Sequence, residues 1–121
     1  MVKGRKITGG KYHEAKKKKK HSLRGDTRKV KIGKVKQKTM RGMGGNEKVV
    51  LLSSDIANVI DPKTNKAKKV KISTVLETPA NRFLARQNIL VKSAIIETEL
   101  GKAKITNRPS QEGSVQAVLI K

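Results

Sequence analysis

Five consecutive lysines, Lys16 to Lys20, give this 121-residue sequence its strongest chemical signal. Residues 1–41 contain 17 lysines and arginines but only two acidic residues, and the whole chain carries a formal net charge of +21. A cationic side chain that neutralises a phosphate releases condensed counterions, which favours binding. A block of one charge beside a better-balanced domain is typical of an arm that binds a polyanion, which could be RNA, DNA or an acidic membrane surface.

The same arm has little apolar surface to bury. Glycines at positions 4, 9, 10 and 25 interrupt any helix, and the apolar residues are scattered. Without a partner we therefore expect residues 1–28 to be disordered; fully extended, they would reach about 90 Å. A solvated tail or a localisation signal would explain an isolated lysine run. Because basic residues continue through Arg24, Arg28 and Lys31, RNA binding is favoured here.

Two further groups of residues could bind phosphates. The segment from Arg41 to Asn46 contains three glycines, so its backbone N–H groups could converge on an anion. A hinge or a hairpin loop explains this segment equally well, and it lacks the Lys-Ser or Lys-Thr pair of a Walker loop. Arg82 and Arg86 would share a face if the residues between them are helical, and both could then contact phosphates. The alternative is an ordinary charged surface loop.

Catalysis and metal binding have little support in the sequence. His13 and His21 could act as an acid–base pair on RNA, but an unfolded arm would not hold them in place, so we assign them to the basic arm. Tyr12 could stack on a base or serve only as a spacer. There is no cysteine, which excludes disulfides and Cys-based metal sites. We expect no enzyme, cofactor or metal site, because the spacing of the remaining candidate carboxylates matches no site type: Asp55, Asp61, Glu97 and Glu99.

Hydropathy and aromatic content narrow the class of protein further. No apolar run approaches the ~20 residues of a membrane span, and the N-terminus lacks an apolar signal core. We therefore expect a cytoplasmic protein without a membrane partner. With one Phe, one Tyr and no Trp, the core must be aliphatic, and a row of aromatic rings that stacks on bases is not possible.

The elements that must position these side chains are short strands. The alternation from Val70 to Leu76 is the clearest, Asp61 to Lys66 has the composition of a hairpin turn, and Leu100-Gly101 is a second tight hairpin. Six or seven such runs and no long helix predict an all-β fold: a small closed or nearly closed antiparallel β-barrel of about six strands. We expect an extended basic arm over residues 1–28 and a β-barrel domain over residues 29–121. The expected core consists of Val49, Leu51, Val70, Ile72, Leu76, Ile95, Ile105, Val115 and Val118.

Several motifs, taken in order, resemble a known family. Gly4-Arg5 and Thr8-Gly9-Gly10 precede the lysine run, and Gly44-Gly45-Asn46 precedes an aliphatic strand. The segments DIANVIDPKTNK (55–66), PANRFLAR (79–86) and IIETELGKA (95–103) follow at matching spacing. Together they resemble the eight-e family of archaeal and eukaryotic small-subunit ribosomal proteins, in its short archaeal form. Two departures are Met43, where the family usually has a basic residue, and the absence of a proline after the lysine run.

The resemblance implies a barrel with a basic arm, built into the small ribosomal subunit as a structural constituent without catalytic activity. It implies small-subunit rRNA and neighbouring ribosomal proteins as partners, and no small-molecule substrate. A basic chromatin-type protein that binds DNA is the alternative that composition alone would allow. The candidate RNA-binding residues, from the arm chemistry and the family match together, are Arg5, Lys6, Lys11, Lys16, Lys17, Lys18, Lys19, Lys20, Arg24, Arg28, Arg41, Gly44, Gly45, Asn46, Arg82, Arg86 and Arg108.

Overall fold

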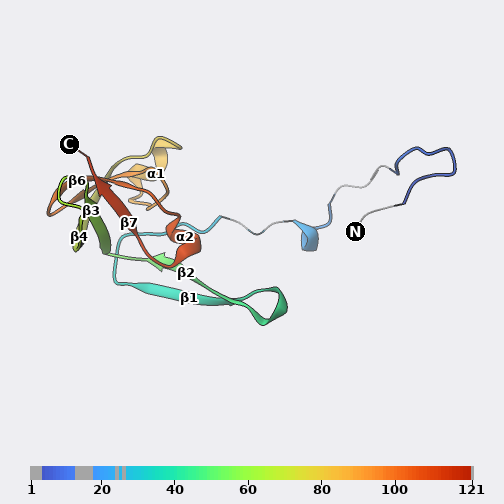
Figure 1. The fold of residues 1–121 in the computed structure, drawn as a ribbon, viewed down its shortest axis with the longest axis horizontal. Helices are drawn as coiled ribbons and strands as arrows, with labels where there is room; N and C mark the ends of the chain where they lie inside the picture. Colours follow the sequence, from blue (N-terminus) through green and yellow to red (C-terminus); the bar gives the residue numbers. More distant parts are fainter. Residues whose placement is uncertain (1–3, 13–17, 24, 26, 121) are drawn as a thin grey trace.

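Five strands close into a barrel that forms the body of the molecule (Figure 1). The computed structural model describes residues 4–12, 18–23, 25 and 27–120. Lys16, Lys17, Arg24 and His13 lie outside the described residues. In chain order, the barrel strands are β3 (Ile56–Asp61), β4 (Lys66–Glu77), β5 (Ile95–Thr98), β6 (Gly101–Ile105) and β7 (Gln116–Leu119).

The remaining elements lie outside the closed barrel. A two-stranded antiparallel hairpin precedes it in the chain and belongs to a separate sheet. The predicted all-β barrel is confirmed, but with five strands, because this hairpin stays outside the closed sheet. The hairpin and the short helices are η1 (Lys20–Ser22), β1 (Lys36–Arg41), η2 (Met43–Gly45), β2 (Glu47–Ser53), α1 (Arg82–Arg86) and α2 (Pro109–Glu112).

The barrel closes through a parallel pair, so the predicted antiparallel pairing throughout the barrel is wrong at this one position. β3 pairs with β7 in parallel, from Asn58 opposite Gln116 to Ile60 opposite Val118. All other neighbours in the barrel are antiparallel. The cause is the strand number: five strands that alternate in direction leave the first and the last running the same way. Closure then requires the parallel pair.

The core is aliphatic, as predicted, and a bulged strand determines which side chains enter it. Five of the nine expected core residues are buried: Leu51, Val70, Ile72, Ile105 and Val115. The register of β4 against β5 shifts between Ile72 and Thr74 and again between Val75 and Glu77. The shift turns Val75 inward and leaves Leu76 43% exposed, which reverses the prediction for these two. Val49 is also exposed, because it belongs to the exposed first half of β2, whereas Val50 and Leu51 after it are buried.

The turns follow the expected chemistry. Asp61 caps the β3–β4 turn by accepting hydrogen bonds from the Lys63 amide and the Thr64 hydroxyl, both at 3.0 Å. Asn65 has a φ of 51°, in the left-handed region where Asn is tolerated. The β5–β6 hairpin joins Thr98 to Gly101, so its loop lies one residue earlier than Leu100-Gly101.

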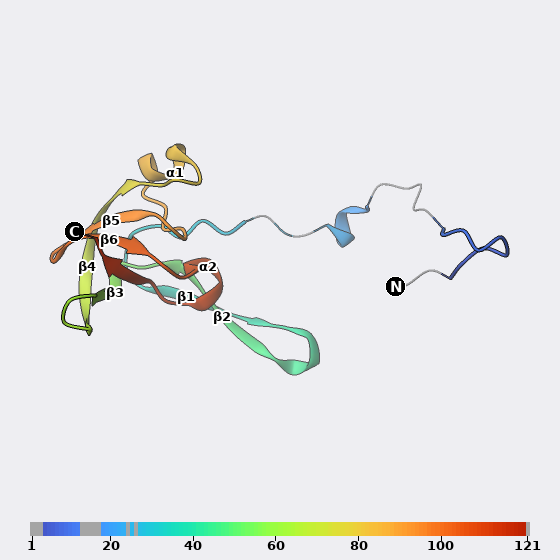
Figure 2. The same ribbon diagram turned by 45° about the horizontal axis from the view of Figure 1, so that its top comes forward.

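The segment between the arm and β1 is fixed to the barrel. Val30 is fully buried, and its carbonyl accepts from the Leu90 amide at 2.8 Å. Lys31 and Gly33 continue this attachment through backbone hydrogen bonds to Leu52 and Ser54. In both views the arm, the tip of the β1–β2 hairpin, α1 and α2 lie toward one side of the barrel, whereas the C-terminus and the β3–β4 turn lie toward the other (Figures 1 and 2). One end of the barrel therefore carries the arm, the hairpin and the two α-helices, and the other end carries the C-terminus and the β3–β4 turn.

Candidate nucleic-acid interface

The described start of the arm forms a compact turn. Arg5 and Lys11 make an antiparallel bridge, and the Gly9 amide donates to the Lys6 carbonyl at 2.8 Å. Gly9 has a φ of +78°, a conformation that glycine adopts without strain. The Arg5 guanidinium donates to the Gly9 carbonyl at 2.9 Å, and the Lys6 ammonium lies 5.7 Å from the centre of the Tyr12 ring. The high charge of the arm did not predict this ordered turn. The sequence feature that indicates it is the Thr8-Gly9-Gly10 motif.

The predicted lysine residues that the structure describes lie on the surface. Lys18 and Lys19 are exposed, and Lys20 is the exposed first residue of η1. His21 lies in the same short helix, with no metal-binding group of carboxylates or histidines around it among the residues described. The arm thus presents its cations without an enclosed pocket in this part.

Arg28 marks where the arm meets the folded body. Its guanidinium donates to the Ser110 carbonyl at 3.4 Å and lies 3.2 Å from the Met40 sulfur. These contacts join the arm to α2 and to β1 respectively. Arg28 therefore has a packing role that its charge alone did not predict.

The β1–β2 hairpin projects from the barrel as a basic ribbon, in which β1 is exposed throughout whereas β2 buries Val50 and Leu51 (Figure 2). All six residues of β1 are exposed, and the region 34–53 contains five basic residues against one carboxylate, Glu47. Gln37 holds the ribbon to the barrel by donating to the Gly113 carbonyl at 2.6 Å. Four lysines of this ribbon were not among the predicted RNA-binding residues, although the spacing of two residues between the first three indicates one exposed face: Lys34, Lys36 and Lys38, with Lys48 on the opposite strand.

The glycine-rich segment is the loop of this hairpin. Gly44 and Gly45 have φ values of 70° and 77°, and Asn46 donates from its side chain to the Met43 carbonyl at 3.1 Å. Arg41 ends β1 beside the loop, opposite Glu47, and has no ion-pair partner among the described residues. The hairpin-loop alternative is therefore correct for the backbone, and the loop carries its cation at the tip of the ribbon.

The helix α1 brings Arg82 and Arg86 together, as their spacing predicted. Asn81 begins the helix by accepting from the Phe83 amide at 2.9 Å. Both arginines line one hollow of about 360 Å³ between β4 and α1. The Arg82 guanidinium lies 5.5 Å from the centre of the exposed Phe83 ring. The planar surface of this pair can stack on an exposed base.

Arg108 lies at the start of the other short helix, α2. It precedes the helix, its amide donates to Glu112 at 3.3 Å, and its guanidinium donates to Gln111 at 3.4 Å. These bonds hold the side chain along the helix. Arg108 is thus more constrained than Arg86, whose side chain has no hydrogen-bond or ion-pair partner within the described ranges.

The candidate acidic cluster does not assemble. Asp61 caps its turn, whereas Glu97 accepts from the Thr74 hydroxyl at 3.1 Å on another strand pair. Residues 4–12, 18–23, 25 and 27–120 contain no group of three potential metal ligands. The same residues include no helix that is long and apolar enough to cross a membrane.

Known proteins are similar to this chain across almost its whole length. The family model described as ribosomal protein S8e matches residues 2–120. Curated relatives named small ribosomal subunit protein eS8 include that of Methanococcus aeolicus, which is 50% identical over 96% of this chain and 91% of its own length. That of Methanosarcina barkeri is 46% identical over 96% and 93%, and that of Sulfurisphaera tokodaii is 47% identical over 97% and 92%.

Proposed function

Since this chain belongs to the ribosomal protein S8e family, we propose that it is a structural component of the small ribosomal subunit and binds small-subunit rRNA there. The observation that carries this proposal is the family match over residues 2–120. The protein acts in the cytoplasm as part of the ribosome, beside other ribosomal proteins. Its contribution is to stabilise folded rRNA rather than to catalyse a reaction.

The basic end of the barrel is the surface that we assign to rRNA. The arm, the β1–β2 ribbon and the two short helices leave the barrel on this side (Figures 1 and 2). Double-stranded RNA is recognised mainly through phosphates, 2′-hydroxyls and shape, which suits separate cationic elements on a rigid support. The proposed RNA-binding residues are the seventeen predicted from the sequence, together with Lys34, Lys36, Lys38 and Lys48 of the ribbon.

The arm and the barrel have different roles in this proposal: the arm extends into the rRNA, and the barrel fixes the point from which the arm extends. We propose that residues 1–28 lie in grooves or junctions of the rRNA that the barrel cannot enter, and that this arm takes its final fold there. Disordered segments that fold on binding can wrap large surfaces, at the cost of the ordering entropy. Residues 29–121 form the domain that fixes where the arm begins.

Co-sedimentation tests this proposal against the alternative of a chromatin-type DNA-binding protein. Tagged full chain should sediment with small ribosomal subunits at low salt and leave them at high salt, because phosphate contacts weaken steeply with ionic strength. With purified duplex DNA as competitor, the protein should remain with the subunits. Recovery with chromosomal DNA instead of subunits would contradict the ribosomal role.

A further inference from the structure

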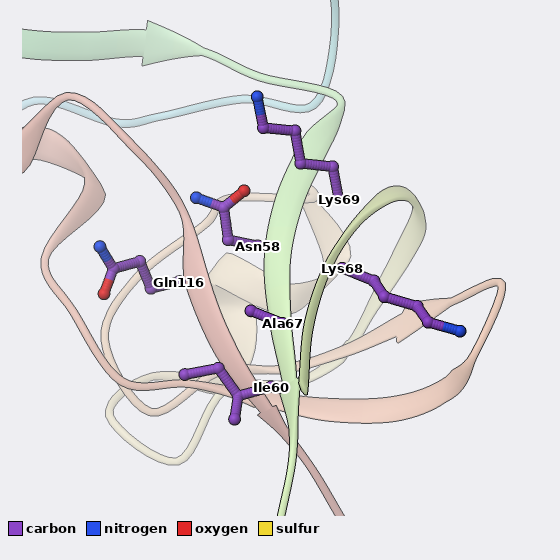
Figure 3. Close-up of a pocket in the computed structure, with 6 residues that line it drawn as sticks. All are labelled: Asn58, Ile60, Ala67, Lys68, Lys69 and Gln116. Atoms are coloured by element: carbon purple, nitrogen blue, oxygen red, sulfur yellow. The ribbon is translucent and has the colours of Figure 1, made fainter. Parts of the chain in front are cut away.

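A pocket of about 360 Å³ opens on the outer surface of the barrel, and none of the proposed RNA-binding residues belongs to its lining (Figure 3). Strands β3, β4 and β7 contribute its walls. Since these three strands are neighbours in a closed barrel, the framework of the pocket is rigid. The lining residues are Asn58, Ile60, Ala67, Lys68, Lys69 and Gln116.

Strand register places complementary side chains in adjacent rows of this pocket. Asn58 is paired with Lys69 on one side and with Gln116 on the other, so these three residues form one row across the strands. In the next row of the same face, Ile60 is opposite Ala67. Polar side chains thus stand beside a small apolar floor.

The two amide side chains in this row are available to a ligand. Asn58 and Gln116 have no side-chain hydrogen bond among the described residues. Other amides of the barrel are already used: Asn107 bonds Ser114 and Gln116 backbone groups, and Gln37 bonds Gly113. A side-chain amide has a hydrogen-bond donor and a hydrogen-bond acceptor. Two adjacent unpaired amides are therefore complementary to a planar ligand that carries a donor and an acceptor on one edge.

The charge around the pocket favours an anionic ligand. Two lysines and no carboxylate belong to its lining. Lys69 extends over the same face as Asn58, whereas Lys68 points to the opposite side of the strand from Gln116 (Figure 3). A second hollow of about 170 Å³ shares Asn58 and Lys69 and continues to Gln37 at the base of the basic ribbon. The pocket therefore connects with the surface that we assign to rRNA.

We propose that this pocket receives one unpaired adenosine of the rRNA. The base lies on Ile60 and Ala67, the Asn58 and Gln116 amides bond its donor–acceptor edge, and Lys69 contacts an adjoining phosphate. Asn and Gln pair with the adjacent donor and acceptor of adenine in a bidentate manner, and unstacked bases are the main carriers of sequence in RNA recognition. This inference rests on the proposed ribosomal function and adds a base-specific site to it.

Chemical probing of the rRNA tests the site with the full chain. Protein-free small-subunit rRNA is incubated with wild-type protein, with the double variant Asn58→Leu/Gln116→Met, or with the control Gln87→Met, which removes an exposed amide elsewhere. Diethyl pyrocarbonate, which reacts at adenine N7 beside the N6 donor, then reports which unpaired adenines remain reactive. We expect wild type and control to protect an adenine that the double variant leaves reactive, with about tenfold weaker overall binding, the loss of one base contact. Circular dichroism melting verifies that all three proteins fold.

The outcomes separate this site from the function on which it rests. If the double variant protects the same adenines as wild type, the adenosine site is wrong while rRNA binding stands. If wild-type protein does not bind the rRNA, the proposed function itself fails. If the double variant keeps every protection but loses a cross-link to a neighbouring protein in assembled subunits, the occupant is a protein, and the RNA site is overturned.

Discussion

Asn107 connects the loop after β6 to β7 with both ends of its side-chain amide. Its Nδ2 donates to the Ser114 carbonyl at 2.7 Å, and its Oδ1 accepts from the Gln116 amide at 3.0 Å. The residue is 8% exposed, so water cannot readily replace these bonds. At the scale of single residues, such contacts hold the α2 corner in place and with it Arg108.

Replacing Asn107 by Ala should lower the free energy of unfolding by about 2 kcal/mol, because two partly buried backbone groups lose their partner. Asn107→Asp keeps the acceptor for Gln116 but sets a carboxylate oxygen against the Ser114 carbonyl, so it should cost no less than the Ala variant. Urea unfolding of the two full-length variants measures both losses. A loss for Asn107→Asp well below that for Asn107→Ala would show that the bond to Ser114 contributes little to stability. The exposed Gln87→Ala serves as the control and should stay within about 0.5 kcal/mol of wild type.

Gly113 is a position where the backbone approaches a neighbouring strand, β2, too closely for a side chain. It ends α2 with a φ of +69°, and a Cβ there would lie 3.1 Å from the Val49 Cγ1 and 3.2 Å from the Val49 carbonyl. Gly113→Ala should therefore destabilise by about 2–3 kcal/mol, from left-handed backbone strain plus crowding against β2.

Gly45→Ala is the matched control for this substitution. Gly45 has a similar φ of +77° but nothing within 4 Å of its would-be Cβ, so only the backbone cost of about 1 kcal/mol should remain. Thermal unfolding of both variants separates the two contributions. A loss for Gly113→Ala no larger than that for Gly45→Ala would mean that contact with β2 is unimportant.

At the scale of elements, the β1–β2 ribbon differs from the barrel strands in what its side chains contact. Its strand β1 is exposed along its whole length, and Gln37 anchors its base to Gly113. Its cations can therefore be altered without touching the core. This makes the ribbon the best element in which to test phosphate binding separately from folding.

Lys38→Gln/Arg41→Gln should weaken rRNA binding at low salt and reduce the salt slope by roughly 0.7 for each lost phosphate contact. The control Lys63→Gln/Lys66→Gln removes the same charge from the β3–β4 turn, at the opposite end of the barrel (Figure 1). Filter binding across a potassium chloride series compares them. A loss of the same size in both pairs would mean that net charge, not the ribbon, determines affinity.

Element prediction from sequence succeeded where the determining chemistry is local. The β3–β4 turn was predictable because Asp61, Pro62 and Asn65 specify it within six residues. The bulge in β4 was not, because it depends on pairing with β5 and on Asn88, whose side chain accepts from the Val75 amide at 3.2 Å. A partner thirteen residues away leaves no mark in the alternation of β4 itself.

At the scale of the whole molecule, topology brings together residues that are distant in the sequence. The basic arm was predictable because charge density is a property of a continuous stretch. The adenosine pocket was not, because Asn58 and Gln116 become neighbours only through the parallel closure of β3 against β7. That closure depends on the parity of the strand number, and one additional strand in the barrel would have changed it. The composition and periodicity of the sequence thus do not predict the long-range strand pairing that forms this pocket.

The boundary between arm and barrel supplies the final prediction, in which a truncation separates binding from folding. Removing residues 2–26 deletes ten basic residues but keeps Arg28 and its contacts with Ser110 and Met40. This variant should melt close to the full chain, yet incorporate poorly into small subunits. If about half of the deleted cations contact phosphates, its salt slope for rRNA should fall by roughly 3–4. Removing residues 2–30 should in addition destabilise the barrel, because Val30 is fully buried. Normal assembly of the shorter truncation at cellular salt would show that the arm is dispensable, and equal melting of both truncations would place the boundary after Val30.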